Sequence, residues 1–147
     1  MKFVITIILF SLSCQLMGQR QEEMLTKSLL SYLNYQSVLR TRVYICNDGL
    51  PVDFPTNSIS NAIFFSLKNF NGLPKPLKKE LKKGISASFI STKLMDNQFT
   101  VTIGGRNVKL IKKNHIEISV ASWGIFIYEY SCEKQKWLLI KTEYGGI

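Results

Sequence analysis

From Ile85 to the last residue, apolar and polar residues alternate with a period of two. Successive side chains of a β-strand point to opposite faces, so this period predicts strands that bury one face. Turn residues interrupt the alternation at Asp96-Asn97 and at Gly104–Asn107, which predicts antiparallel hairpins. We expect about five strands, at 85–94, in a hairpin over 99–110, at 116–120, and in a last pair at 125–131 and 137–144.

The last pair has a predicted register. Apolar residues gather on one side if Phe126 lies opposite Thr142, Tyr128 opposite Ile140, and Tyr130 opposite Leu138, because directly opposed residues of antiparallel strands share a face. We expect that side to face the helices. The other side carries Ile127 and Glu129, and it places Lys141 diagonal to Glu129.

Helical periodicity precedes the strands. Gln21–Leu39 has an apolar stripe at spacings of three and four, which predicts an amphipathic helix. A second helix is expected to begin at Ser58 or Ser60 and to end before Gly72. A third is expected from Pro76 to Gly84. The residues expected to face the core are Leu25, Leu29, Tyr32 and Leu33 in the first helix, Ile59, Ile63, Leu67 and Phe70 in the second, and Leu77 and Leu81 in the third.

A short strand is expected at Arg42–Cys46, ended by the turn residues Asn47-Asp48-Gly49. Helices followed by strands predict an α+β domain, with the helices on one face of a curved antiparallel sheet. This order is similar in layout to cystatin-like folds, by analogy only, since no family motif accompanies it. The 147 residues have the length of one domain.

Residues 1–18 have the layout of a signal peptide: Lys2, an apolar run from Phe3 to Phe10, then small and polar residues. We therefore expect an exported protein, periplasmic or secreted, with a single domain at 19–147. The apolar run is too short for a membrane-spanning helix. Cleavage before Cys14 would allow lipidation there, although the Leu usual three positions earlier is replaced by Ser11. Cleavage after Gly18 is the alternative.

Removal of residues 1–18 leaves Cys46 and Cys132 as the only cysteines, 86 positions apart. Export leads to an oxidising compartment, so we expect a disulfide between them. The alternative is a pair of free thiols, of which buried examples are common.

Positive charge is concentrated in one segment. The whole chain has a net charge of +9, and Lys75–Lys113 holds ten basic and two acidic residues. On the third helix, four lysines share the face opposite Leu77 and Leu81. This predicted basic ridge consists of Lys78, Lys79, Lys82 and Lys83. The ridge fits an anionic partner such as an acidic glycan, a lipid head group or an acidic protein, or else it serves only solubility.

The sequence carries no pattern of a known catalytic or metal site. His115 is the only histidine, and it lies between two predicted strands, where a solvated residue is expected. Several carboxylates could act as acid and base if they met in a cleft. They are Asp48, Asp53, Glu117, Glu129 and Glu143. We expect no metal and no cofactor.

Glu129 is the carboxylate of most interest, because alternation places it on the same strand face as Ile127. A carboxylate on an apolar face is either part of a site or one member of an ion pair, and Lys141 is the expected partner. Ile127, Glu129 and Lys141 therefore mark a candidate cleft.

These patterns favour an exported, non-enzymatic binding or interaction domain whose basic ridge faces an anionic partner. Export and the scarcity of aromatic residues among the lysines argue against nucleic acid. The alternatives are a small carboxylate-dependent hydrolase and an envelope-associated structural subunit lipidated at Cys14.

Overall fold

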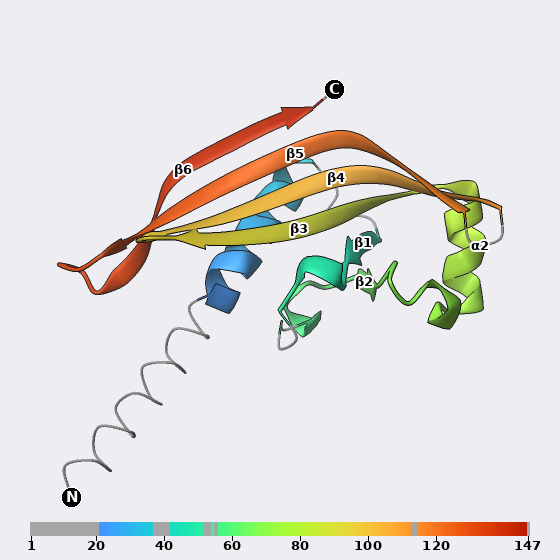
Figure 1. Cartoon of the computed structure of the whole chain (residues 1–147), viewed down its shortest axis with the longest axis horizontal. Helices are drawn as coiled ribbons and strands as arrows, with labels where there is room; N and C mark the ends of the chain where they lie inside the picture. Colours follow the sequence, from blue (N-terminus) through green and yellow to red (C-terminus); the bar gives the residue numbers. More distant parts are fainter. Residues whose placement is uncertain (1–20, 37–41, 52–53, 55, 113–114, 147) are drawn as a thin grey trace, which may run out of the picture.

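Three long antiparallel strands form the centre of a six-stranded mixed sheet (Figure 1). The computed structural model describes residues 21–36, 42–51, 54, 56–112 and 115–146. The strand order is β2-β1-β3-β4-β5-β6, in which β1 is parallel to β2 and β3 and the remaining pairs are antiparallel. The strands are β1 (Val43–Cys46), β2 (Ala62–Phe65), β3 (Ile85–Met95), β4 (Gln98–Lys112), β5 (His115–Ser131) and β6 (Lys136–Gly146).

The α+β class is confirmed, but the sheet has six strands rather than about five, and it is not wholly antiparallel. Residues 21–35 form the N-terminal helix, and α2 covers Lys75–Lys83. The predicted signal peptide with Cys14 and the end of the first predicted helix lie outside the described residues. No helix within the described part of the chain is long and apolar enough to span a bilayer.

The expected turn at Gly104–Asn107 is wrong, because β4 continues through it. Gly104 and Gly105 pair with both neighbouring strands. A Cβ on Gly105 would lie 2.3 Å from the Tyr32 hydroxyl and 2.3 Å from the Ser122 hydroxyl, which hydrogen-bond to each other at 2.5 Å. This glycine therefore lets the N-terminal helix approach the sheet closely and does not mark a reversal of the chain. The separate strands expected at 116–120 and 125–131 are likewise one strand, β5.

The predicted helix over 58–70 is also wrong. This stretch holds β2, preceded by a 3-10 turn at Thr56–Ser58 (η2) and followed by another at Phe70–Gly72 (η3). Asn61 adopts the left-handed backbone conformation, with φ of 64°, which a continuous helix does not tolerate. Ile63 and Phe64 then pair with β1, where β-branched and aromatic residues fit a pleated surface.

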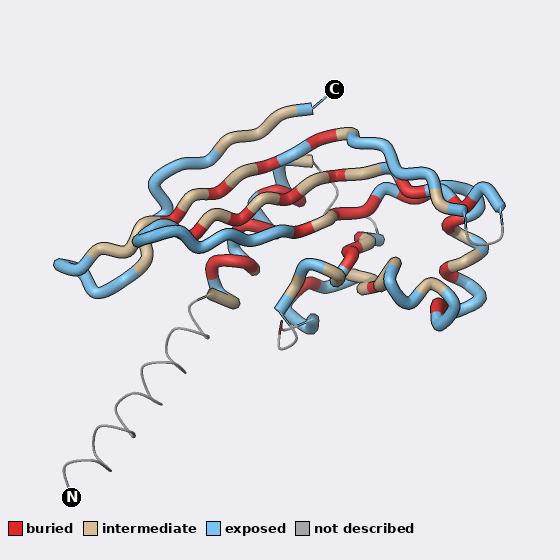
Figure 2. The backbone as a smooth tube through the Cα atoms, in the orientation of Figure 1, coloured by how far each residue is buried: buried red, intermediate tan, exposed pale blue. Residues whose placement is uncertain are grey.

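The sheet buries opposite faces at its two ends. Figure 2 shows buried residues alternating with more exposed ones along the long strands. One core packs the N-terminal helix against the face that carries Ile90 of β3, and the other packs α2 against the face that carries Ile85 and Ala87. Because β3 pairs with β4 without a register shift, odd and even residues point to opposite faces throughout β3. The two helices therefore cover opposite faces, not the single face that was expected.

The first core confirms the apolar stripe of the N-terminal helix. It brings Met24, Leu25, Leu29, Tyr32 and Leu33 together with Phe99, Val101, Ile103, Phe126 and Tyr128. The Tyr128 hydroxyl donates to the Met24 carbonyl at 3.2 Å and hydrogen-bonds to the Ser28 hydroxyl at 2.9 Å. The polar tip of this buried ring is therefore satisfied, as a buried hydroxyl requires.

The last hairpin follows the predicted register over only part of its length. Phe126 lies opposite Thr142, as expected, but a bulge between Ile127 and Tyr128 shifts the remainder. Tyr128 consequently faces Leu139, and Tyr130 faces Trp137, where Ile140 and Leu138 had been expected. The orientation is confirmed, because Phe126 and Tyr128 are buried while Ile125 and Ile127 are half-exposed.

The predicted disulfide is absent: Cys46 is a buried free thiol and Cys132 an exposed one. Cys46 lies opposite Phe89, while Cys132 follows β5 beyond the far end of β3 at Met95. Six residues of strand separate these two positions along β3, or about 20 Å, and a disulfide joins Cα atoms no more than about 7 Å apart. An oxidising compartment permits a disulfide but does not bring two distant cysteines together.

The close approach at Gly105 predicts that one added methyl group lowers the stability of the protein considerably. Gly105→Ala should lower the stability by about 2 kcal/mol through overpacking, and the melting temperature by roughly 5 to 10 °C. Gly104→Ala is the matched control, since its Cβ would meet no atom closer than the Arg106 Nε at 3.6 Å. Thermal unfolding followed by circular dichroism measures both, and equal losses would contradict the assigned role of Gly105.

The two cysteines should differ in reactivity. Burial raises the pKa of the Cys46 thiol, and the negative charge of the nearby Asp48 carboxylate acts in the same direction, so less of the reactive thiolate is present. We expect a maleimide to modify Cys132 in the native protein and Cys46 only in denaturant, as read by peptide mapping. Recovery of two peptides joined through Cys46 and Cys132 would show that the disulfide forms after all.

Candidate anion-binding groove

The helix α2 is fixed by a few local features of its sequence. Pro76 lies in its first turn, and Gly84 ends it with a φ of 92°, a conformation that favours glycine. Leu77 and Leu81 are buried against the sheet, in a core with Val108. The third predicted helix is therefore confirmed, and its lysines necessarily lie on the faces that this contact leaves free.

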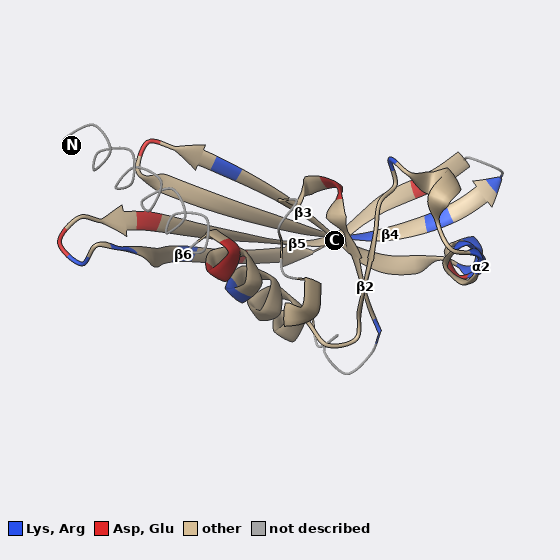
Figure 3. Ribbon diagram, turned by 90° about the horizontal axis from the view of Figure 1, so that it is seen from below, with Lys and Arg blue, Asp and Glu red and all other residues tan. Residues whose placement is uncertain are grey.

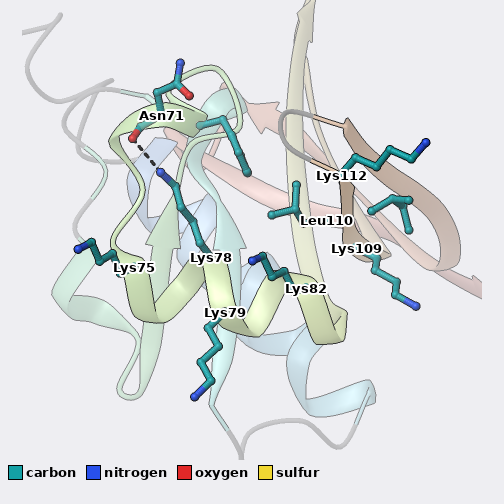
Figure 4. A pocket seen from close by; sticks show the side chains of 10 residues that line it. Asn71, Lys75, Lys78, Lys79, Lys82, Lys109, Leu110 and Lys112 are labelled. Carbon is teal, nitrogen blue, oxygen red and sulfur yellow. Dashed lines mark hydrogen bonds between the residues drawn. The ribbon is translucent and has the colours of Figure 1, made fainter.

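A groove with a volume of about 960 Å³ lies between α2, η3 and the end of β4 (Figure 4). Its apolar lining consists of one aromatic and two aliphatic side chains, and Figure 4 shows Leu110 directed towards α2. The remaining lining is polar or cationic. The full set is Phe70, Asn71, Lys75, Lys78, Lys79, Lys82, Lys109, Leu110, Ile111 and Lys112.

Six lysines and no acidic residue line this groove. The one acidic residue of α2, Glu80, is held by other partners: Arg42 Nη1 lies 2.8 Å from its Oε1, and the Tyr44 hydroxyl donates to its Oε2 at 2.7 Å. The Glu80 carboxylate thus neutralises Arg42 and not the lysines of the groove. Figure 3 shows the basic residues gathered on α2 and on the adjacent end of β4.

Lys78 is held in place by its surroundings. Its Nζ donates to the Asn71 carbonyl at 2.9 Å and lies 5.5 Å from the centroid of the Phe70 ring. The other lining lysines have no hydrogen-bond or ion-pair partner among the residues that the structure describes. Lys78 therefore joins η3 to α2, and the other ammonium groups remain available to a ligand.

Asp48 positions the η3 wall of the groove. Its carboxylate accepts hydrogen bonds from the Ser66 hydroxyl, from Leu67 N at 2.9 Å and from Lys68 N at 3.3 Å, just before Phe70. Burial acts to raise the pKa of Asp48, but these hydrogen bonds outweigh it and hold the pKa below its usual value. Asp48 therefore holds the chain segment that leads into η3.

The predicted ridge is brought together only in part. Lys78, Lys79 and Lys82 line the groove, whereas Lys83 lines a neighbouring hollow together with Lys109 and Glu117. Lys75, Lys109 and Lys112 were not among the predicted site residues. The positive charge of Lys75–Lys113 gave the available signal for them, but only the β4 register places Lys109 and Lys112 beside α2.

The candidate cleft at Ile127, Glu129 and Lys141 does not take the expected form. Lys141 Nζ lies 2.6 Å from Glu143 Oε1, and Glu129 instead accepts from Gln98 Nε2 at 3.5 Å. These three residues line none of the larger hollows, which lie beside α2 and between the N-terminal helix and β6. Lys141 and Glu143 are two residues apart on β6 and therefore share one face of that strand.

The other candidates for chemistry are dispersed. His115 is exposed at the start of β5, and Asp53 lies outside the described residues. The part of the chain described by the structure holds no group of three or more His, Cys, Asp or Glu that could bind a metal ion.

Comparisons with protein-family models, with curated proteins and with solved structures find no match to this chain. The groove and its charge are therefore the evidence on function.

The hydrogen bonds to Asp48 predict a loss of stability in acid. Because its folded-state pKa is depressed, the contribution is present above the unfolded-state pKa of about 3.9 and is lost as the pH falls through the lower folded-state value. Asp48→Asn should cost about 2 kcal/mol at pH 7 and remove this part of the pH dependence.

Urea unfolding at pH 7 and at about pH 3 tests this expectation. Glu133→Gln serves as the control, since Glu133 is exposed in the turn between β5 and β6. A stability difference between Asp48→Asn and the wild type that is as large at pH 3 as at pH 7 would contradict the account.

Proposed function

We propose that this protein is an exported, non-enzymatic binding domain that holds an anionic partner in the groove between α2 and β4. The observation that carries the proposal is a groove of about 960 Å³ lined by six lysines and no acid. A hollow lined by charges of one sign attracts and concentrates counter-ions, and an acidic glycan, a lipid head group or an acidic protein supplies that charge.

Export is proposed from the sequence alone, from the signal-peptide pattern of residues 1–18. Nucleic acid fits the groove less well, because single strands are held largely by stacking on aromatic side chains and only Phe70 among the lining residues is aromatic. The Phe70 ring also already lies against the Lys78 ammonium group.

Binding of the anionic partner should weaken when lysines of the groove are replaced, but not when the same number of lysines is replaced elsewhere. In one variant, Lys75, Lys82 and Lys112 are replaced by Gln, which keeps the helix propensity of α2 nearly unchanged. In the control, Lys93, Lys134 and Lys136 are replaced by Gln, so both proteins lose three charges. At roughly 0.5 kcal/mol per exposed charge pair, the groove variant should bind heparin oligosaccharides about tenfold more weakly.

Titration calorimetry at low salt measures this affinity, and repetition at high salt should weaken binding by the wild type most. Equal weakening in the two variants would show that only net charge matters and would overturn the groove as the site.

A further inference from the structure

Exposed apolar side chains lie at the same end of the sheet as the lysines. Ile111 lines the groove and is 44% exposed, and Ile118 on β5 is 41% exposed. Large apolar residues exposed beside a cationic groove are a combination typical of surfaces that contact lipid.

The register places Ile118 beside the α2 core. It lies opposite Val108, and Ile116 lies opposite Leu110, so these residues share the face that α2 covers. Val120 continues this row and is 50% exposed. Within the described residues, β6 pairs with β5 only from Ser122 onward, so this part of β5 has no strand on its outer side.

The lining of the groove suits a lipid surface better than a sugar. Apart from lysine, Asn71 is its only polar residue, so the lining offers a single uncharged hydrogen-bonding side chain. Recognition of a glycan relies on several placed hydrogen-bonding groups, whereas lysine acts as a flexible point charge that suits phosphate in many orientations.

We propose that this end of the molecule docks onto an anionic phospholipid surface. The lysines of α2 and β4 lie against the lipid phosphates, while Ile111 and Ile118 enter the boundary between head groups and acyl chains. This inference rests on the proposed function, since it names the lipid surface as the anionic partner. It adds an apolar contribution that a soluble anion does not require.

Vesicle co-sedimentation tests the inference, with vesicles of phosphatidylglycerol mixed with phosphatidylcholine and of phosphatidylcholine alone. The wild type should bind the anionic vesicles only. At about 1 kcal/mol per lysine near the surface, replacing Lys75, Lys82 and Lys112 by Gln should weaken vesicle binding by about two orders of magnitude. Replacing Ile111 and Ile118 by Ser keeps every charge and should weaken it at least tenfold.

The matched control replaces Leu139 and Ile140 by Ser. Each is 51% exposed on β6. Leu139 lies opposite Tyr128 of β5, which is about 40 Å along that strand from Ile116, so the control residues are far from the groove. These changes should leave vesicle binding unchanged. Circular dichroism melting curves identify any variant that has lost its fold. If the double variant is unfolded, the single variants Ile111→Ser and Ile118→Ser are measured in its place.

The heparin measurement separates the two proposals. Loss of vesicle binding in the isoleucine variant with unchanged heparin affinity supports the inference. Heparin binding by the wild type without binding to anionic vesicles overturns the inference and leaves the proposed function standing. Absence of binding to both probes overturns the inference and removes glycan and lipid from the proposed partners, and equal loss in the isoleucine variant and in the β6 control overturns the docking surface.

Discussion

The contact of Leu77 and Leu81 with the end of the sheet determines where the charge of this protein lies. The two leucines are buried in a core with Val108 and Leu110, and this contact fixes the rotation of α2 about its axis. A helix of nine residues that is mostly lysine has little stability of its own, so tertiary packing must hold it. The lysines of α2 consequently line the same groove as Lys109 and Lys112 of β4.

The long strands impose the rest of the arrangement. One face of β3 and β4 is buried beneath the N-terminal helix, and the opposite face is buried beneath α2. Burying different faces at the two ends leaves the remainder of each face open to solvent. On the α2 face, the open portion includes Ile118 and Val120, and therefore apolar surface lies next to the lysines.

The sequence predicts the local elements well and their juxtaposition poorly. Period and capping identify the N-terminal helix, α2 and the strand character of the C-terminal half, because these signals are local. Gly104-Gly105 has the composition of a turn, but it permits a contact with Tyr32 that is distant in the chain. The same limit applies to Ile63, whose spacing fits a helix although pairing with β1 makes it part of a strand.

The candidate site shows the same division. The lysines of α2 are predicted from one helix face, whereas Lys109 and Lys112 join them only through the register of β4 and the position of α2. The sequence predicts that Phe70 faces the protein core from a helix, whereas Phe70 belongs to η3 and lines the groove. Asp48 appears in the sequence as a turn residue, and its hydrogen bonds to the segment after β2 depend on the parallel pairing of β1 with β2.

The most direct test of the groove is residue-level mapping of anion binding by NMR, in which a heparin tetrasaccharide is titrated into the labelled protein. Amide shifts should concentrate at Asn71, in α2 and at 109–112, and β6 should be unaffected. Shifts centred on Ile127, Glu129 and Lys141, or spread evenly over all exposed lysines, would show that the groove is not the binding site.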